Sequence, residues 1–501
     1  MRHALRNLCL GAGLVAGCTS DGGGDGTDTD PSSSTGNDSD SSATTVSASS
    51  AETSTGNPTS DSSSSQGPTS GTSTDTDADT SAGSSSTGVV DLPPPSEDWT
   101  RDILTTDLQL DLGALSGVAT ITIAGSADST GASLEIGGLT IDSVTSDLGD
   151  VMFDVHDGQL DLGIPSGGDF TFVVSYTFAS VDGSFDGWDP TSQVTFLWPY
   201  FCGNLFPCKS DPSDGVQFTM NVTGFAGDQT AIYPASIPGD APSYQPAVAV
   251  AAFTELVLDP TTNGTAVSTW YLPGGQADAS IGSQHLSAVF DFYEQTYGDY
   301  SFGDHVGTVS ADWGGGDYGG MEHHPYWHVS SGSMDREDVH AHEAAHGWYG
   351  DGVRIACWED FVLSEGTATY LAARSLAESG VDLWPDYECG LVSVCDGGVN
   401  PVVLPDSTCN GIDILNDDLW SYAPYMKGAW FYRGVAELIG EDQLDTALAE
   451  FYADHVGQAA RMQDMIDHLH DYGDAAAIDD LADAWLRQVE CPVDVGSLCA
   501  G

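Results

Sequence analysis

The sequence predicts an α+β protein of more than one domain, in which a β-sandwich or saddle-shaped domain precedes a mostly helical domain. Three observations support this prediction. Residues 19–96 consist almost entirely of Ser, Thr, Gly and Asp, residues 101–275 alternate apolar and polar side chains as strands do, and from about residue 277 the apolar spacing becomes helical. The roughly 400 residues after the first segment are enough for two domains with sizeable cores.

Residues 1–18 have the features of a lipoprotein signal peptide. Arg2 and Arg6 form a positive start, and an apolar run from Leu8 to Gly17 ends at Cys18. The run is too short for a membrane span, which needs about 20 apolar residues. Small residues directly before a cysteine resemble the bacterial lipobox, so we expect cleavage there and lipid on the Cys18 thiol. An ordinary secretory signal cleaved nearby is the alternative.

Residues 19–96 are predicted to be a disordered linker. The segment has almost no apolar side chains, so it cannot bury enough surface to offset the entropy lost on ordering. A flexible chain of this length spans on the order of 50 Å. We expect it to act as a tether between the lipid anchor and the folded domains.

Residues 97–275 are predicted to form the β domain. Leu108 and Leu110 stand two apart, and residues 170–176 and 216–222 are further strand-like runs. Clusters of Gly, Asp and Pro separate these runs. Short strands at this spacing indicate a β-sandwich or a saddle.

Residues 276–492 are predicted to form the helical domain, followed by a short tail at residues 493–501. Its first helix is expected at residues 281–296. The apolar stripe of that helix consists of Leu286, Val289, Phe290 and Tyr293. Later helices are expected at 427–439, 444–452, 462–470 and 481–489, and strands of a small sheet at 305–311 and 321–330.

The cysteines indicate an oxidising compartment. Eight cysteines follow Cys9 and Cys18, and an even number in an exported chain predicts disulfide bonds. Eight cysteines allow 105 connectivities. The pairs that close short loops are Cys202–Cys208, Cys389–Cys395 and Cys491–Cys499.

The charge balance is extreme, with 75 acidic against 11 basic residues and a net charge of −64. Such a field repels nucleic acid and anionic lipid and favours solubility, so no nucleic-acid partner is expected. It would also attract cations, including the free amino termini of peptides.

The chemistry of the chain is concentrated in the segment His342-Glu343-Ala344-Ala345-His346. Two histidines four apart lie on one face of a helix, so both rings can reach one metal ion. The glutamate beside the first histidine points elsewhere around the helix, where it can contact a metal-bound water. This arrangement is typical of a zinc site with two histidine ligands and a carboxylate general base.

Glu365 is the predicted third ligand, because catalytic zinc takes three protein ligands and keeps one open position. It stands nineteen residues after His346, beyond a break that contains Gly350 and Gly352, at the start of a second predicted helix. We therefore expect one Zn²⁺ per chain.

The string from His342 to Tyr370 resembles the zinc signature of the aminopeptidase N family of gluzincin metallopeptidases. Trp358, Asp360, Leu363, Glu365 and Gly366 fit the frame that surrounds the family's third ligand. The resemblance covers residues 101–492 and implies a saddle-shaped β domain followed by a thermolysin-like catalytic domain.

Three further motifs in this chain resemble those of the family. Gly319-Gly320-Met321-Glu322-His323 is similar to GxMEN, with histidine where the family usually has asparagine. Tyr425-Met426-Lys427-Gly428-Ala429 is similar to YxKGA, and Phe206-Pro207-Cys208-Lys209-Ser210-Asp211-Pro212 loosely matches the FPCxDEP turn of the β domain.

The resemblance implies a role for each site residue. Glu343 would act as the general base and Tyr425 would donate its hydroxyl to the oxyanion, as a phenol can. Glu322, in its frame of Gly320 and Met321, would bind the free α-amine of the substrate. The leading interpretation is therefore an exported zinc aminopeptidase acting on peptides.

Two alternatives remain open. The chain carries Trp198 near the position where the family places a second amine-binding side chain, and the C-terminal helical domain of larger relatives is not expected, which favours an endopeptidase with an open cleft. The other alternative is a catalytically inactive surface-binding lipoprotein, although the presence of Glu343 and Tyr425 argues against it. In each case we expect the bacterial cell envelope, with a lipid anchor in the outer membrane, or a secreted protein.

Overall fold

The computed structural model describes residues 91–499, apart from residues 182, 184, 185, 314–318, 407, 408 and 410. The predicted signal peptide, Cys18 and nearly all of the predicted linker lie outside the described residues. The described residues all fall in one compact unit of the chain. No helix among them is long and apolar enough to cross a membrane.

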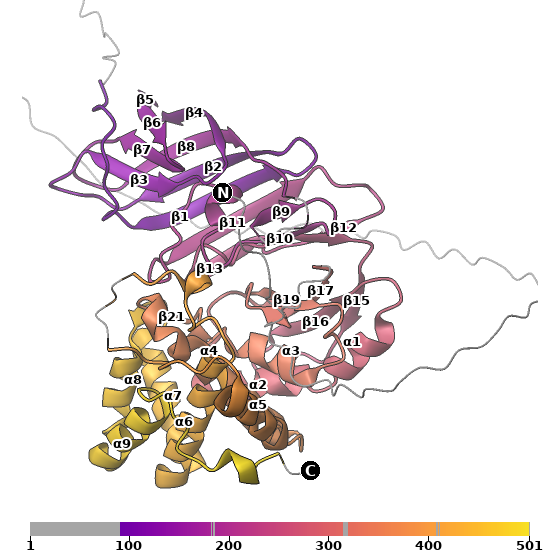
Figure 1. Ribbon diagram of the computed structural model, residues 1–501. Helices are drawn as coiled ribbons and strands as arrows, with labels where there is room; N and C mark the ends of the chain where they lie inside the picture. The colour runs from indigo at the N-terminus through magenta and orange to yellow at the C-terminus, as the bar shows by residue number, and fades with distance from the viewer. Residues whose placement is uncertain are drawn as a thin grey trace, which may run out of the picture. The chain divides into compact units, whose positions relative to one another are not determined.

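The first part of the described chain is built from strands, drawn in indigo and magenta in Figure 1. Its largest sheet has the order β13 (Ser236–Ala241), β11 (Val216–Thr223), β1 (Ile103–Asp111), β2 (Ser116–Ile123), β8 (Phe170–Thr177), β4 (Thr140–Ser146) and β5 (Gly149–Asp150). Leu108 and Leu110 of β1 are buried while Gln109 between them is exposed, so the predicted alternation is confirmed.

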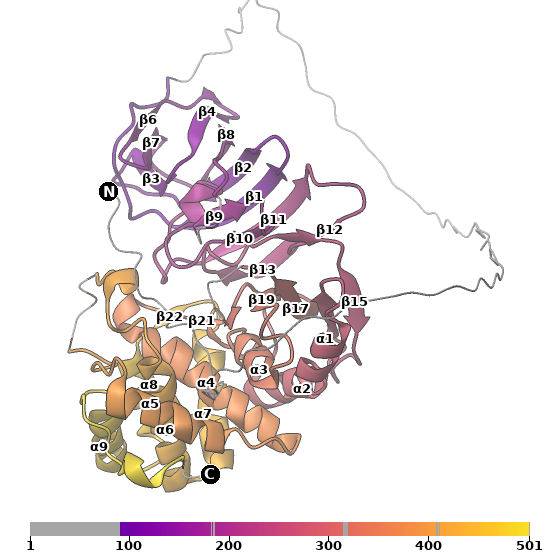
Figure 2. The ribbon, with the colours of Figure 1, turned by 45° about the vertical axis from the view of Figure 1, so that its right-hand side comes forward.

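Two smaller sheets complete this region. One has the order β3 (Gly131–Glu135), β7 (Gln159–Gly163) and β6 (Phe153–His156), and Figures 1 and 2 show it beside the β8–β4 part of the large sheet. The other has the order β12 (Thr230–Ile232), β14 (Ala249–Ala251), β10 (Val194–Phe196) and β9 (Gly187–Asp189). The predicted fold class, with strands first and helices later, is therefore confirmed.

A five-stranded sheet begins the second region. Its order is β15 (Thr254–Val257), β16 (Ala266–Tyr271), β17 (His305–Ala311), β19 (Tyr326–Ser330) and β18 (Gly320–Met321). Strands β16 and β17 are parallel, and a parallel pair needs a crossover, which α1 (Gln276–Gly282) and α2 (Leu286–Tyr297) provide. The boundary predicted after residue 275 thus lies inside this sheet in sequence, after strands β15 and β16 and before the other three strands.

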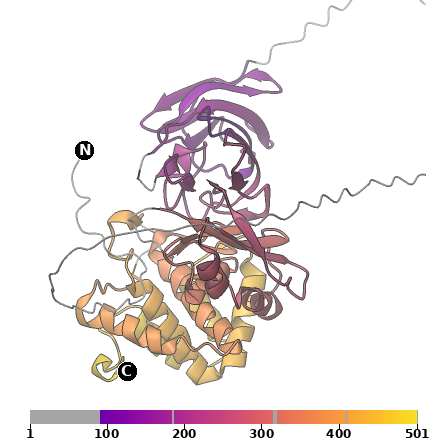
Figure 3. The ribbon, with the colours of Figure 1, turned by 90° about the vertical axis from the view of Figure 1, so that its right-hand side faces the viewer.

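The apolar stripe predicted for the first helix is buried, but the helix expected at residues 281–296 is interrupted between α1 and α2. The remaining helices are α3 (Glu337–Ala345), α4 (Phe361–Glu378), α5 (Trp384–Gly397), α6 (Ala423–Ile439), α7 (Glu441–His455), α8 (Met462–Leu469) and α9 (Ala475–Trp485). Helix α6 packs against α4, α5, α7 and α9, and Figure 3 shows these later helices gathered together.

Two predicted features of the helical region were wrong or missed. The last helix, expected at residues 481–489, is α9 and spans Ala475–Trp485. It begins earlier than expected because the Asp474 side chain caps its start by accepting from the Ala476 amide. Helix α5 was not predicted, since two cysteines and two glycines obscure its apolar stripe.

The described cysteines form four disulfide bonds. Cys202–Cys208 is confirmed, but the predicted pairs Cys389–Cys395 and Cys491–Cys499 are wrong. The other three bonds are Cys357–Cys409, Cys389–Cys499 and Cys395–Cys491. Cys389 and Cys395 both lie on α5, and the two bonds they form join this helix to the C-terminal segment.

Candidate active site

The two histidines of the sequence motif lie together at the end of α3. Glu337 and Asp338 occupy the first turn of this helix, where negative charge is favourable, and His346 follows its last helical residue. The Nε2 atoms of His342 and His346 are 3.1 Å apart. Both rings therefore point their Nε2 atoms at one location.

Glu365 reaches the same location from α4, which packs against α3. Its Oε2 atom is 3.1 Å from His342 Nε2 and 3.5 Å from His346 Nε2. A tetrahedral zinc ion with bonds of about 2.0–2.1 Å holds its ligand atoms about 3.3 Å apart. Two imidazole nitrogens and one carboxylate oxygen at this spacing fit a zinc ion, and the three predicted ligands are brought together.

Each zinc-facing histidine is oriented by a bond to its other nitrogen. His346 Nδ1 donates to the backbone oxygen of Tyr349 at 3.0 Å. His342 Nδ1 is 3.4 Å from the Thr369 hydroxyl, which itself donates to the backbone oxygen of Glu365 at 2.6 Å. Such partners fix the tautomer in which Nε2 is free to bind a metal.

Glu343 is buried beside this site. A side chain at position 320 would place its Cβ 2.4 Å from Glu343 Oε1, so only glycine leaves the carboxylate its place. Burial, with the nearby acidic side chains, raises the pKa of Glu343 well above its ordinary value. A carboxyl group with a raised pKa suits the exchange of protons near neutral pH.

Tyr425 projects from the first turn of α6 onto the metal ligands. Its ring stacks on His342, with centroids 5.6 Å apart, and meets Phe361 edge-on at 6.2 Å. Burial, and the neighbouring carboxylates, raise the pKa of Tyr425 well above its ordinary value. The hydroxyl therefore stays protonated and is available as a hydrogen-bond donor.

Glu322 directly follows β18 and enters the cleft from the side of the sheet. Ligand atoms of Glu322, Glu343 and His346 all lie within 4.8 Å of one another. Burial raises the pKa of Glu322 to about 7. The predicted amine-binding carboxylate is thus adjacent to the predicted metal site and general base.

His323, the departure from the family motif, points away from this cleft. Its Nδ1 is 3.3 Å from His328 Nδ1, and its ring meets Phe196 edge-on. The next residue, His324, donates from Nε2 to the backbone oxygen of Glu343 at 2.8 Å and accepts from the Tyr300 hydroxyl. His324 therefore bonds to the backbone of the predicted general base, and His323 packs outside the cleft.

Aromatic side chains form much of the cleft wall. The ring of Trp198 meets that of Trp358 edge-on at 5.6 Å and lies 5.6 Å from that of Trp420. An apolar indole therefore occupies the position at which the sequence analysis looked for a second amine-binding carboxylate. Other lining residues that the sequence analysis did not name as site residues are Asp338, Val339, Thr369, Tyr387, Trp420, Ser421 and Tyr422. Only Thr369 carried a signal, because it stands one helical turn after Glu365.

The fold and the site together define the class of protein: a strand-rich region followed by a catalytic region with the ligand set of a gluzincin metallopeptidase. Residues 325–485 match the peptidase family M1 domain. The chain therefore contains a peptidase family M1 domain, the domain of the aminopeptidase N family, and the predicted family resemblance is confirmed. Zinc is the metal that this family implies, in agreement with the donor set.

Two curated relatives are leucine aminopeptidases of fungi. The chain is 26% identical over 322 residues to leucine aminopeptidase 2-1 of Meyerozyma guilliermondii, covering 58% of this chain and 50% of that protein. It is 32% identical over 151 residues to leucine aminopeptidase 2 of Aspergillus oryzae, covering 28% of this chain and 24% of that protein. The matches span half or less of the length of these relatives.

Solved structures share the fold. An M1 zinc metallopeptidase from Deinococcus radiodurans, crystallised with a Tyr-Ser-Ala substrate, aligns with a TM-score of 0.67 at 18% identity, covering 78% of this chain and 95% of that one. A two-domain M1 zinc metallopeptidase bound to L-tryptophan aligns with a TM-score of 0.68 at 18% identity, covering 81% and 99%. At this identity the likeness shows the fold alone.

Proposed function

We propose that this protein is a zinc aminopeptidase that removes N-terminal residues from peptides, with one zinc ion per chain bound by His342, His346 and Glu365. The observation that carries the proposal is the position of Glu322, whose carboxylate lies within 4.8 Å of both a metal-ligand nitrogen and the general base. A carboxylate at this distance can hold an α-ammonium group beside the first peptide bond. The likeness to fungal leucine aminopeptidases and to M1 zinc metallopeptidases supports it.

The residues of the site divide the chemistry among them. A bound zinc ion would supply a Lewis acid and lower the pKa of a coordinated water to about 7. Glu343 would accept a proton from the attacking water and deliver it to the leaving amine. The Tyr425 hydroxyl donates a hydrogen bond to the oxygen of the attacked carbonyl, while Glu322 holds the substrate by its amine.

A second candidate function is that of an endopeptidase. The wall around Trp198 is apolar, so Glu322 is the only carboxylate assigned to the amine. A longer peptide lying through the cleft would not need a free amine at that point. This candidate uses the same metal, base and oxyanion donor.

The experiment compares one fluorogenic peptide with a free amine and with an acetylated amine, before and after treatment with a chelator. We expect cleavage of the free peptide only, loss of activity with the chelator and recovery with zinc. Equal internal cleavage of the acetylated peptide would establish the endopeptidase. No cleavage of either peptide by the zinc-loaded protein would leave a surface-binding protein.

We also propose that the mature protein is exported and bound to a membrane by lipid on Cys18. The lipobox-like sequence before Cys18 and the disulfide-rich structure support this location. Expressed with its own signal in a bacterium, the protein should fractionate with membranes, and Cys18→Ser should abolish lipidation. A soluble mature protein that begins downstream of Cys18 would instead identify an ordinary secretory signal.

A further inference from the structure

We propose that Gly366 of α4 and Gly428 of α6 are positioning residues for Tyr425. The two glycines let the helices touch backbone to backbone, and this contact sets the place of the Tyr425 hydroxyl beside the metal ligands. The proposal rests on the proposed function, because it concerns the oxyanion donor of the same site. Both glycines belong to the motifs found in the sequence, yet neither lines the cleft, and the proposed chemistry gives neither of them a role.

The two glycines meet where α4 packs against α6. A Cβ at position 428 would lie 2.4 Å from the Cα of Gly366, and a Cβ at position 366 would lie 2.7 Å from the Cα of Gly428. Carbon atoms in favourable contact are about 3.5–4.0 Å apart. Because the atom met is a backbone atom in each case, no change of rotamer relieves the clash. This spacing of the two helices therefore requires glycine at both positions.

Backbone conformation does not explain these two glycines. Both lie inside α-helices, and neither has a positive φ. Inside a helix, glycine is less favourable than alanine by about 1 kcal/mol. The close approach of the two backbones is therefore the physical reason for glycine at these positions.

The contact lies next to both functional side chains in sequence. Gly366 directly follows the metal ligand Glu365. A Cβ at position 366 would also come within 3.1 Å of the backbone oxygen of Pro424, the residue before Tyr425. The separation of the helices at this point therefore sets the distance between Glu365 and Tyr425. An added methyl group would push the first turn of α6 away from α4.

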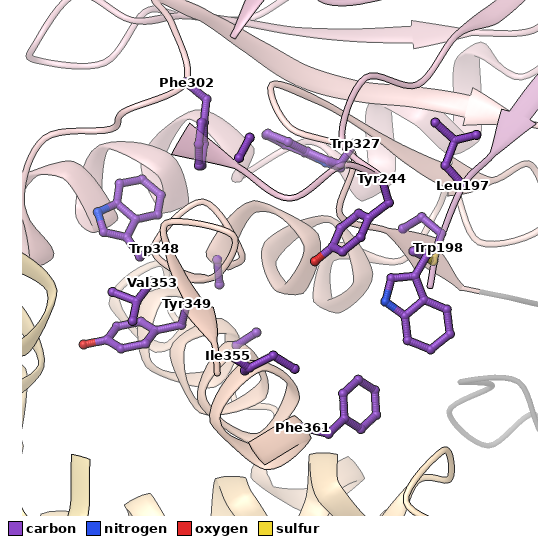
Figure 4. Close-up of a cluster of buried hydrophobic side chains, with 14 of the residues drawn as sticks. Leu197, Trp198, Tyr244, Phe302, Trp327, Trp348, Tyr349, Val353, Ile355 and Phe361 are labelled. Carbon is purple, nitrogen blue, oxygen red and sulfur yellow. The ribbon is translucent and has the colours of Figure 1, made fainter. Parts of the chain in front are cut away.

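The ring of Tyr425 makes two contacts with the helices that carry the metal ligands. It stacks on His342 of α3 and meets Phe361 of α4 edge-on. The ring of Phe361 in turn lies 6.1 Å from that of Trp198, and Figure 4 shows these two rings facing each other near the start of α4. The backbone of Tyr425 belongs to α6 instead. A shift of α6 would therefore move the hydroxyl relative to His342 and Glu365, without moving these ligands.

A purely structural role would be to hold the two helices together. Other contacts between α4 and α6 already do so, since Thr367 donates to the Tyr432 hydroxyl at 2.9 Å and the rings of Tyr370 and Tyr432 lie 5.6 Å apart. Gly434 of α6 supplies a matched control. A Cβ there would point at α9 and meet the end of the flexible Leu481 side chain at 3.1 Å. Gly434→Ala is thus the same replacement in the same helix, directed away from α4.

The readout must separate a displaced Tyr425 hydroxyl from a general loss of stability. A double-mutant cycle of Gly428→Ala with Tyr425→Phe does so, because only an effect that acts through the hydroxyl disappears when the hydroxyl is absent. We would measure kcat and KM on the fluorogenic peptide with a free amine, using the zinc-loaded protein. The four single variants are Gly428→Ala, Gly366→Ala, Gly434→Ala and Tyr425→Phe, and the melting temperature and zinc content of every variant are recorded.

We expect Gly428→Ala to lower kcat about 10- to 100-fold, as a misplacement of about 1 Å does, with little change in KM or zinc content. In the Tyr425→Phe protein, the same replacement should lower kcat no more than about twofold, because the hydroxyl that it displaces is already gone. Gly366→Ala should act in the same direction as Gly428→Ala. Gly434→Ala should leave kcat unchanged.

Three results would overturn the proposal. An equal fall in kcat from Gly428→Ala with and without the Tyr425 hydroxyl would show that the glycines act independently of Tyr425. A lower melting temperature with unchanged kcat would assign the pair to stability alone, as would the failure of both Gly428→Ala and Gly366→Ala to fold. A different result concerns the proposed function itself: if Tyr425→Phe alone keeps full turnover, Tyr425 is not the oxyanion donor.

Discussion

The two ends of the cleft are built differently. At the metal end, His342, His346 and Glu365 come from two helices that are neighbours in sequence, and each is oriented by bonds within the same segment. At the amine end, Glu322 follows a two-residue strand, and Trp198 from the distant strand-rich region lines the same cleft. The comparison indicates that the chemistry of bond cleavage is encoded locally, whereas the selection of substrates depends on the packing of distant segments.

The largest expected effect is at the metal end. Glu343→Gln removes the base but keeps the shape of the side chain, so we expect a fall in turnover of about 10²–10⁴. Zinc content and the inhibition constant of leucine hydroxamate should stay close to those of the unmodified protein. Metal analysis and steady-state kinetics would check both. Full activity in this variant would remove Glu343 from its role and break the assignment of the metal end.

Tyr425→Phe should have the next largest effect. The change removes one hydroxyl and retains the stacking of the ring on His342. If the hydroxyl stabilises the oxyanion, kcat should fall by about 10²–10³ while KM changes little. An effect confined to KM would mean that Tyr425 only shapes the cleft, and would move it from the chemistry of the metal end to substrate binding.

At the amine end, Glu322→Ala should act on selection. Loss of a charge-assisted hydrogen bond of about 1.5–3 kcal/mol should lower kcat/KM for free peptides by about 10- to 150-fold. Turnover of an acetylated peptide, where detectable, should not fall. A conservative control is Glu322→Asp, which keeps the charge on a shorter side chain. Equal loss on both peptides would show that Glu322 supports the metal end rather than the amine.

The metal end could be predicted almost completely from the sequence, because a helical period and a fixed spacing determine which side chains face one ion. His342, Glu343 and His346 needed no knowledge of distant contacts, whereas Glu365 was predicted from the need for a third ligand and from the resemblance to the family's zinc signature. The strands and most later helices were predicted for the same reason, since local periodicity reports the buried face.

The surroundings of the amine end and the disulfides between distant cysteines could not be predicted in this way. The pairing of Cys389 with Cys499 depends on the course of the chain around α5, a helix whose apolar period is weak. Nothing in the sequence around Tyr244 indicates that its hydroxyl meets Asp351, a residue 107 positions away. Such contacts form when two regions pack together. The apolar periodicity and the motif spacing within one segment do not predict them.

The smallest expected effect concerns the buried histidines behind the amine end. Burial lowers the pKa of His328 to about 3, and it likewise lowers that of His324, whose Nε2 donates to a backbone oxygen while Nδ1 accepts from Tyr300. In the unfolded chain a histidine titrates near pH 6.5. Between about pH 6.5 and 3 the unfolded state therefore binds more protons than the folded state. The contribution of each such histidine to the free energy of unfolding is fully present above pH 6.5. It is lost as the pH falls through this window, by about 1.4 kcal/mol per pH unit.

His328→Gln should therefore reduce the slope of unfolding free energy against pH by about one proton, as measured by urea unfolding between pH 7 and 5. Comparing the variant with the unmodified protein cancels the pH dependence of zinc binding, which both share. His156→Gln is the control, because a hydrogen bond to Asp161 raises the pKa of this exposed histidine and its removal should not lessen the acid sensitivity. An unchanged slope in His328→Gln would show that the amine end is already hydrated in the folded state, and that it is no more acid-sensitive than the metal end.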